Sequence, residues 1–151
     1  MLFYMKKDTL AELIRSAGFR ATKPRLLLIS YLKKLKYPQT ILEIAEGLQD
    51  SIDQVTVYRI VDAFKKTGLI REIDLRQGRP RYEISDADHD HHHVVCVSCN
   101  RIEDFTGCRY EELANKALKQ TKGFAKITSH AMEFFGLCNA CMKRGNSLQM
   151  A

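Results

Sequence analysis

The apolar residues in the first half of the chain recur at the spacing of amphipathic helices. The first predicted helix stops at Gly18, and its apolar face consists of Leu10, Leu13, Ile14 and Ala17. A second begins near Pro24, a residue favoured at the first helical position, and is broken by residues 37–39. The pattern therefore predicts two short helices before residue 40.

Two capping patterns predict the next pair of helices. Thr40 and Glu43 have the spacing of a capping box, which predicts a helix over residues 41–48. Ser51 and Gln54 repeat that spacing and predict a fourth helix, which ends at Gly68. The apolar and aromatic positions of this helix are Val55, Val57, Tyr58, Val61 and Phe64.

A β-hairpin is expected after the helices, with strands over residues 69–75 and 80–84 around the turn at 76–79. Helices joined by a tight turn and followed by a hairpin are typical of a winged helix, whose second helix of the pair enters the DNA major groove. Candidate contacts on that helix are Gln54, Thr56, Tyr58 and Arg59, and the basic residues near the wing turn are Arg76, Arg79 and Arg81. The alternatives are a core role for Tyr58 and a merely solvated turn for the arginines.

Charge divides the chain into two halves. Residues 1–85 hold 16 Lys and Arg against 10 Asp and Glu, whereas residues 86–151 hold 8 of each. All five His and all five Cys lie at or beyond position 89. A basic excess indicates a polyanionic partner, although a solubilising charge is an equal alternative.

The second half carries two C-x2-C pairs, separated by 38 residues, whose four thiols are Cys96, Cys99, Cys138 and Cys141. Two such turns can complete a tetrahedral four-thiolate site, which zinc favours in structural roles. Disulfides are the competing interpretation, and a cytosolic chain disfavours them. Cys108 is left over, and we interpret it as a half-buried structural thiol.

Five ligand-type residues precede the first pair, at positions 89–93, and the β-branched residues after them predict a strand. Side chains alternate along a strand, so His91 and His93 point one way and Asp90 and His92 the other. One strand could thus serve two sites for Fe, Zn, Mn, Co or Ni. The alternative is a fortuitous histidine cluster.

The remaining pattern predicts a helix over residues 109–122, flanked by short strands at 101–105 and 126–135. We expect an α+β fold with a winged helix-turn-helix DNA-binding domain (residues 1–84), a hinge (85–90) and a small α/β metal-binding dimerisation domain (91–151). The sheet of the second domain has too few elements of its own to cover its apolar surface, so we expect it to pair with a second copy of the chain. No apolar run approaches the roughly 20 residues that span a bilayer, and residues 1–5 are too short for a signal-peptide core, so we expect a cytoplasmic protein with no membrane partner.

Three segments together resemble the ferric uptake regulator (Fur) family: residues 18–25, residues 55–59, and the histidine cluster running into the first C-x2-C pair. The resemblance covers about residues 8–143. It implies a homodimeric regulator of transcription, in most members a repressor, of metal-homeostasis or stress genes. Such a regulator binds double-stranded operator DNA when a regulatory metal occupies the domain junction, and it has no small organic substrate.

The resemblance also assigns residues by position. The structural zinc falls on Cys96, Cys99, Cys138 and Cys141. The regulatory site, for Fe2+, Mn2+ or Zn2+, falls on Glu83, His91, His93 and Asp104. A third site of some members falls on Asp90, His92, Glu111 and His130. The DNA-binding residues are Arg20, Lys23, Gln54, Thr56, Tyr58, Arg59, Arg76 and Arg79.

Two positions depart from the family pattern. Many members supply a regulatory His from the loop between the second and third helices, and residues 36–40 contain none. Asp104 stands where iron sensors usually have Glu and peroxide sensors often have Asp. Peroxide sensing in those relatives, however, uses the missing His, so a metal-sensing, a peroxide-sensing and a zinc-sensing function all stay open.

An enzyme is the rival from another class, because a His and carboxylate metal site with an open position could hydrolyse a substrate. Zinc deaminases combine H-x-E with P-C-x-x-C, and the sequence has no H-x-E and no Pro before either pair. A structural zinc module that bridges proteins would leave the basic half unexplained. We therefore expect no enzyme activity, and salt-dependent DNA binding separates a regulator from both rivals.

Overall fold

The computed structural model describes residues 7–85 and 91–145 of the chain. These residues form two compact units, one within Met1–Ser85 and one within Asp86–Ala151. Most of the expected hinge, residues 86–90, lies outside the described residues. Among the described helices, none is long and apolar enough to cross a bilayer.

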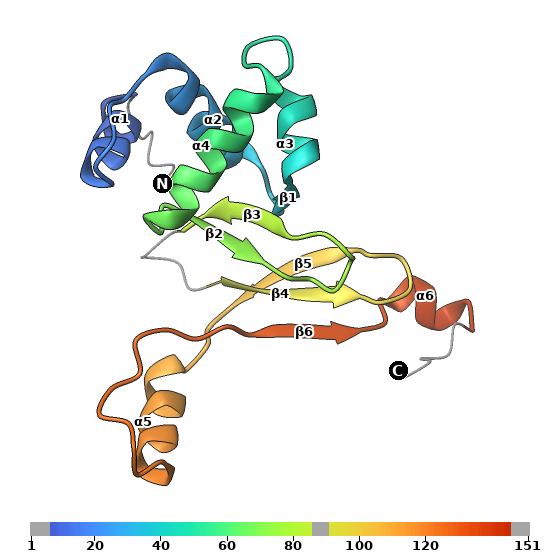
Figure 1. Ribbon diagram of the computed structural model, residues 1–151. Coiled ribbons are helices and arrows are strands. Elements are labelled where there is room, and N and C mark those ends of the chain that lie inside the picture. The colour runs from blue at the N-terminus through green and yellow to red at the C-terminus, as the bar shows by residue number, and fades with distance from the viewer. Residues whose placement is uncertain (1–6, 86–90, 146–151) are drawn as a thin grey trace. The chain divides into compact units, whose positions relative to one another are not determined.

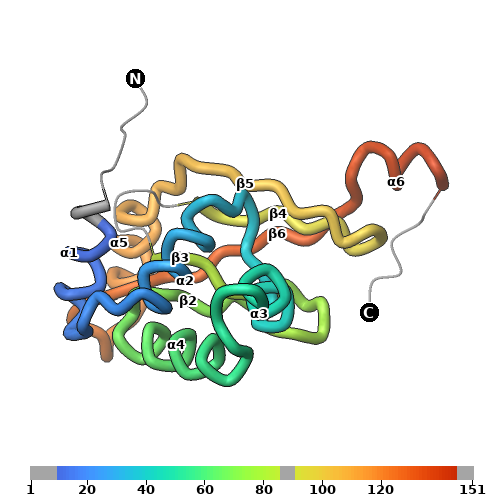
Figure 2. Tube along the Cα trace, turned by 90° about the horizontal axis from the view of Figure 1, so that it is seen from above, coloured from blue at the N-terminus to red at the C-terminus, as the bar shows by residue number. Residues whose placement is uncertain are grey.

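Four helices and a three-stranded sheet make up the described part of the first unit (Figure 1). The helices are α1 (Lys7–Ser16), α2 (Lys23–Lys34), α3 (Ile41–Leu48) and α4 (Gln54–Lys66). The strands are β1 (Gln39–Thr40), β2 (Ile70–Ile73) and β3 (Arg81–Ile84), in the order β1-β3-β2. The pair α3 and α4 lie side by side, with α4 leading into the β2–β3 hairpin (Figure 2). The predicted winged helix is confirmed.

The caps of α3 and α4 explain where these helices begin. The Thr40 hydroxyl accepts from the Glu43 backbone N–H at 3.3 Å, and the Thr40 N–H donates to the Glu43 carboxylate at 2.7 Å, so the predicted capping box is confirmed. The Ser51 cap is wrong. Both Ser51 and Ile52 still donate N–H bonds back to Leu48, and the cap of α4 is Asp53, which accepts from the Thr56 N–H at 2.9 Å.

The core of the first unit is built on one face of α4. Its buried residues are Val57, Ile60, Val61 and Phe64, and the Phe64 ring lies 5.3 Å from that of Phe19. Two positions counted in the apolar pattern face solvent instead: Val55 is 58% exposed and Tyr58 38%. The helical period accounts for this difference, because both positions fall on the face of α4 opposite Ile60 and Phe64.

The wing strands are shorter than predicted. The antiparallel pair β2–β3 runs from Ile70 opposite Ile84 to Ile73 opposite Arg81. The connection then takes residues 74–80, with φ of 55° at Arg76 and 78° at Gly78. The Asp74 carboxylate accepts from the Arg76 N–H at 2.8 Å, and this local turn begins at Asp74, so the ladder ends at Ile73 rather than at residue 75. Strand β1, which was not predicted, pairs with the other side of β3.

The second unit, within its described residues, has a three-stranded sheet and two helices. These are β4 (His91–Cys96), β5 (Ile102–Thr106), α5 (Tyr110–Gln120), β6 (Glu133–Gly136) and α6 (Asn139–Lys143), with sheet order β5-β4-β6. Strand β4 pairs antiparallel with β5 and parallel with β6. The α+β class is confirmed, but the last strand starts at Glu133, not at residue 126, and α6 was not predicted. The parallel pairing explains the late start, since the chain must cross over from α5 before it can align with β4.

Candidate metal centres and DNA-contact surface

The four C-x2-C thiols come together from two separate turns. Cys96 is the last residue of β4 and Cys99 lies in the turn that follows, where the Asn100 N–H bonds back to the Cys96 carbonyl. Cys138 is the N-cap of α6, and Cys141 lies within that helix. The four sulfur atoms all lie within 4.8 Å of one another. The two pairs, distant in sequence, thus form one cluster.

Sulfur spacing identifies what this cluster can hold. The Cys99 and Cys138 Sγ atoms are 3.7 Å apart, and all five cysteines of the chain are free thiols. A disulfide would need about 2.0 Å. Four thiolates at about 2.3 Å from a tetrahedral zinc lie about 3.8 Å from one another. The donor set and its spacing therefore fit a structural zinc site, and the disulfide alternative is wrong.

Backbone hydrogen bonds prepare the cluster for a cation. The Cys138 N–H donates to the Cys96 sulfur at 3.3 Å, and this bond, together with the backbone N–H groups of Cys99 and Ser98, lowers the pKa of Cys96 to about 6. The Cys141 N–H likewise lowers the pKa of Cys138. At Cys99 the Arg101 N–H lowers the pKa, but hydrogen bonds with the Cys96 and Cys141 sulfurs outweigh it and raise that pKa to about 11. Without a cation the sulfurs must share protons, whereas a divalent metal would allow all four to be thiolates.

The alternation of the histidines along β4 is confirmed. The rings of His91 and His93 lie 5.3 Å apart, while the His92 ring packs 5.3 Å from Phe105 and 4.9 Å from His130. Both His92 and His93 are buried, with 5% and 2% exposure. Buried imidazoles on two faces of one strand are consistent with two separate sites.

Three of the four expected regulatory ligands belong to the second unit. His93 and Asp104 are directly opposite each other in the β4–β5 ladder, with Nε2 and Oδ1 3.7 Å apart. Glu83 belongs to the first unit, in β3, where it forms a cross-strand ion pair with Arg71. A metal that takes the Glu83 carboxylate would therefore compete with this guanidinium.

At the expected third site, the ligand-type atoms that lie close together differ from the set that the family resemblance assigns. His92 and His130 approach through their Nε2 atoms at 3.2 Å, and the next ligand-type atom is the Cys108 sulfur, 3.7 Å from His130 Nε2. Among the described residues, the group within 4.8 Å here is His92, Cys108 and His130, and Glu111 is not part of it. Asp90 lies outside the described residues. The sequence analysis did not assign Cys108 to this site, although Cys108 lies close in sequence to the assigned ligand Glu111.

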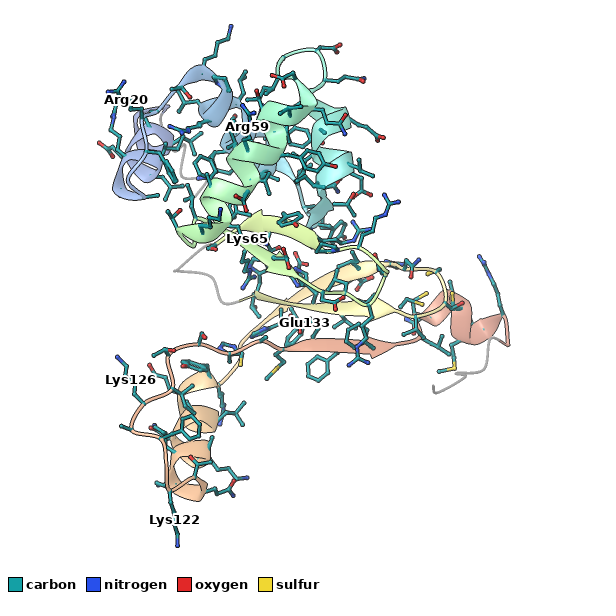
Figure 3. All side chains as sticks on the ribbon, in the orientation of Figure 1. Arg20, Arg59, Lys65, Lys122, Lys126 and Glu133 are labelled. Atoms are coloured by element: carbon teal, nitrogen blue, oxygen red, sulfur yellow. The ribbon has the colours of Figure 1, made fainter. Side chains whose placement is uncertain are left out.

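The expected base-contacting residues lie mostly on the open face of α4. Gln54, Tyr58 and Arg59 are exposed, and so are Arg20 and Lys23 beside the start of α2. Figure 3 labels Arg59 on α4 and Arg20 on the segment that precedes α2. Thr56 differs, because its hydroxyl donates to Asp53 at 2.6 Å and so completes the helix cap. Val55, exposed on the first turn of α4, was missed as a candidate; an apolar side chain there could contact a thymine methyl group.

The wing arginines fall into two kinds. Arg76 and Arg79 are exposed on the connection between β2 and β3. The Arg81 guanidinium instead donates to the Pro38 carbonyl and the Glu43 carboxylate, each at 3.1 Å, and to Gln77 at 3.0 Å. Arg81 is therefore a structural residue that joins β3 to the start of α3, whereas Arg76 and Arg79 are exposed to solvent.

Comparison with known proteins gives a consistent result. Residues 16–135 match the Ferric uptake regulator family. The chain is 30% identical over 135 residues to the ferric uptake regulation protein of Legionella pneumophila, covering 87% of this chain and 97% of the relative. It is 29% identical to the peroxide-responsive repressor PerR of Staphylococcus epidermidis over 93% of this chain and 92% of that protein. The solved structure of the Helicobacter pylori ferric uptake regulator Fur, which has three functional metal-binding sites, aligns with a TM-score of 0.72 at 26% identity over 94% of this chain and 97% of that chain.

Proposed function

Because this chain belongs to the ferric uptake regulator family, we propose that it is a homodimeric repressor that binds operator DNA when a divalent metal occupies its regulatory site. Proteins of this family are metal-responsive regulators of transcription and not enzymes. The observation that carries the proposal is the pairing, in one chain, of a winged helix with an exposed polar recognition face and a unit whose thiols and imidazoles gather as metal ligands. The cytoplasm is the expected location, since operator DNA is there.

Two metal roles follow from the donor sets. We assign a structural zinc to Cys96, Cys99, Cys138 and Cys141, which the sulfur spacing supports. We assign the regulatory Fe2+, Mn2+ or Zn2+ to Glu83, His91, His93 and Asp104. The close approach of His93 to Asp104 supports this assignment, and nitrogen and oxygen donors suit those ions.

The dimer is supported by apolar surface on the second unit. Val94 on β4, Phe134 on β6 and Leu113 on α5 are 40%, 51% and 51% exposed. No residue of α5 is buried in the single chain. Large apolar side chains gathered on one small unit mark an interaction surface, and a second copy of the chain would cover them.

A peroxide-responsive repressor is the second candidate. The similarity to the S. epidermidis PerR protein and the aspartate at position 104 favour it. The absence of His from residues 36–40 weighs against it, because that residue is an oxidisable ligand in peroxide-sensing relatives. The two candidates share the fold, the structural zinc and the DNA surface, so they differ only in the signal.

One experiment tests the proposal and separates the candidates. The metal content of protein purified without added metal is measured, and binding to an A/T-rich palindromic operator is then followed with Fe2+, Mn2+, Zn2+, Ni2+ or Co2+ restored. We expect at least one tightly held zinc per chain and DNA affinity that rises with at least one added metal. Loss of the Fe2+-stimulated binding after hydrogen peroxide, but not of Mn2+-stimulated binding, would identify the peroxide-responsive function. DNA binding that is insensitive to every metal and to salt would contradict the proposal.

A further inference from the structure

We propose that His92, Cys108 and His130 form a thiolate-containing metal site, distinct in ligand chemistry from the set of two carboxylates and two imidazoles expected for the third site. The three side chains come from three separate elements of the second unit. His92 is on β4, Cys108 is in the loop between β5 and α5, and His130 is in the segment between α5 and β6. Their ligand atoms nonetheless lie within 4.8 Å of one another.

The distances match those that a tetrahedral zinc would impose. Two imidazole nitrogens bound to one zinc lie about 3.3 Å apart, and a thiolate sulfur lies about 3.6 Å from each nitrogen. Here His92 Nε2 and His130 Nε2 are 3.2 Å apart, and the Cys108 sulfur is 3.7 Å from His130 Nε2. The alternative is a chain of hydrogen bonds from thiol to imidazole to imidazole with no metal.

The site is held in place by contacts that do not depend on a metal. The Tyr110 ring stacks on His130 with centroids 4.3 Å apart and planes 17° from parallel, and its hydroxyl donates to the Ile127 carbonyl at 3.3 Å. On the other side, His92 is 5% exposed and packs against Phe105. Two of the three ligands are therefore oriented in advance, which lowers the cost of binding.

The thiolate determines which metals the site takes. Sulfur ligands favour zinc and soft ions such as Cu+, whereas Mg2+ and Mn2+ prefer oxygen. A His2Cys set should therefore select zinc over manganese, and Co2+ can serve as its spectroscopic probe. A metal here would also connect α5 and the α5–β6 segment to β4. No residue of α5 is buried in the single chain, so binding should raise the melting temperature of this unit.

Cobalt titration of the full-length protein with its structural zinc in place tests the inference. The regulatory ligands are nitrogen and oxygen, so only a site that contains Cys108 adds a thiolate-to-cobalt charge-transfer band. We expect that band in the wild type, its loss in Cys108→Ser, and at least about tenfold weaker cobalt binding at this site. Ser129→Ala, an exposed neighbour of His130, is the matched control and should bind as the wild type does. Zinc is measured throughout, so that exchange at the four-cysteine cluster is detected.

A second measurement does not depend on the variant being folded. With the other four thiols holding zinc, Cys108 is the thiol that iodoacetamide should modify, and added Zn2+ should slow its modification at least about tenfold. A wild type that retains its zinc but gains no thiolate band, a band that persists in Cys108→Ser, or an alkylation rate unaffected by Zn2+ would each overturn the inference and leave the hydrogen-bonded chain. Metal-stimulated DNA binding is measured separately, so failure here does not bear on the proposed regulatory function.

Discussion

At the scale of single residues, the same residue type serves different roles in neighbouring places. Arg79 and Arg81 are two residues apart in the wing, yet only Arg79 is exposed, because Arg81 is bonded to Pro38 and Glu43. Glu43 in turn completes the capping box of α3. Replacing Arg81 would therefore disturb the start of α3 before it changed any contact with DNA.

The caps of α3 and α4 give a residue-scale prediction with a matched control. Thr40→Ala removes the hydroxyl that accepts from Glu43, and we expect the free energy of unfolding in urea to fall by about 1 kcal/mol. Ser51 has the same spacing to Gln54 as Thr40 has to Glu43, but it does not cap a helix. Ser51→Ala should therefore change the free energy of unfolding by less than about 0.5 kcal/mol. Equal losses in the two variants would mean that the caps are wrongly assigned.

At the scale of elements, residue patterns predicted the helices more accurately than the strands. The bounds of α3 follow from Thr40 and Glu43, since a capping box and the core positions it introduces are local in sequence. The two-residue strand β1 forms only through pairing with β3 and was not predicted from the local pattern. Strand β6 was predicted within residues 126–135, but its start at Glu133 depends on pairing with β4, which is distant in sequence. Cys108 was missed for the same reason, because its neighbours His92 and His130 are distant along the chain.

The cysteine cluster joins two elements, so its loss should affect both. In Cys96→Ser the remaining thiols cannot complete the tetrahedral site, and metal-binding energy is folding energy in such a cluster. In a Cys108→Ser background, which removes the thiolate of the His92 site, we expect adding Cys96→Ser to lower tightly bound zinc from one per chain to near zero after dialysis and to dissociate the dimer, measured by elemental analysis and light scattering. Cys108→Ser alone is the control and should keep the zinc of the four-cysteine cluster. A Cys96→Ser, Cys108→Ser protein that stays dimeric with one tight zinc would refute the assignment.

The recognition helix and the wing should contribute differently to DNA binding. Arg59 is exposed on α4, and Arg59→Ala should weaken operator binding by about 1–3 kcal/mol if it contacts a base edge. Arg79→Ala should weaken binding about equally for all sequences and reduce the salt slope by about one, as expected for a lost phosphate contact. Titrations at several salt concentrations measure both effects. Lys119→Ala, on α5 of the second unit, removes the same charge elsewhere and should leave the slope unchanged.

At the scale of the whole molecule, regulation requires that metal binding in one unit change DNA binding by the other. Glu83 belongs to the first unit, and His91, His93 and Asp104 belong to the second. A metal that binds both sets would favour some orientations of the units and so the spacing of the two recognition helices in a dimer. Only a spacing that matches successive major-groove faces allows both helices to dock. The sequence identifies the ligand types, but no local sequence pattern encodes the orientation of one unit relative to the other.

We expect the coupling between metal binding and DNA binding to be weak. A metal shifts the orientation equilibrium only by its differential affinity for the two states, typically about 1–3 kcal/mol. Residues 36–40 supply no His, and Glu83 already has Arg71 as a partner, so we expect coupling near the lower value, with some DNA binding when the regulatory site is empty.

Two variants test this coupling, because each removes a histidine from a different face of β4. His93→Ala removes the imidazole opposite Asp104 and should abolish metal-stimulated DNA binding while the structural zinc and the dimer persist. His92→Ala acts on the face that holds His130 and should have a smaller effect. Operator titrations with and without the activating metal measure both. If His92→Ala abolishes activation and His93→Ala does not, the regulatory metal lies on the His92 face; if neither variant matters, the histidine cluster is not the sensor.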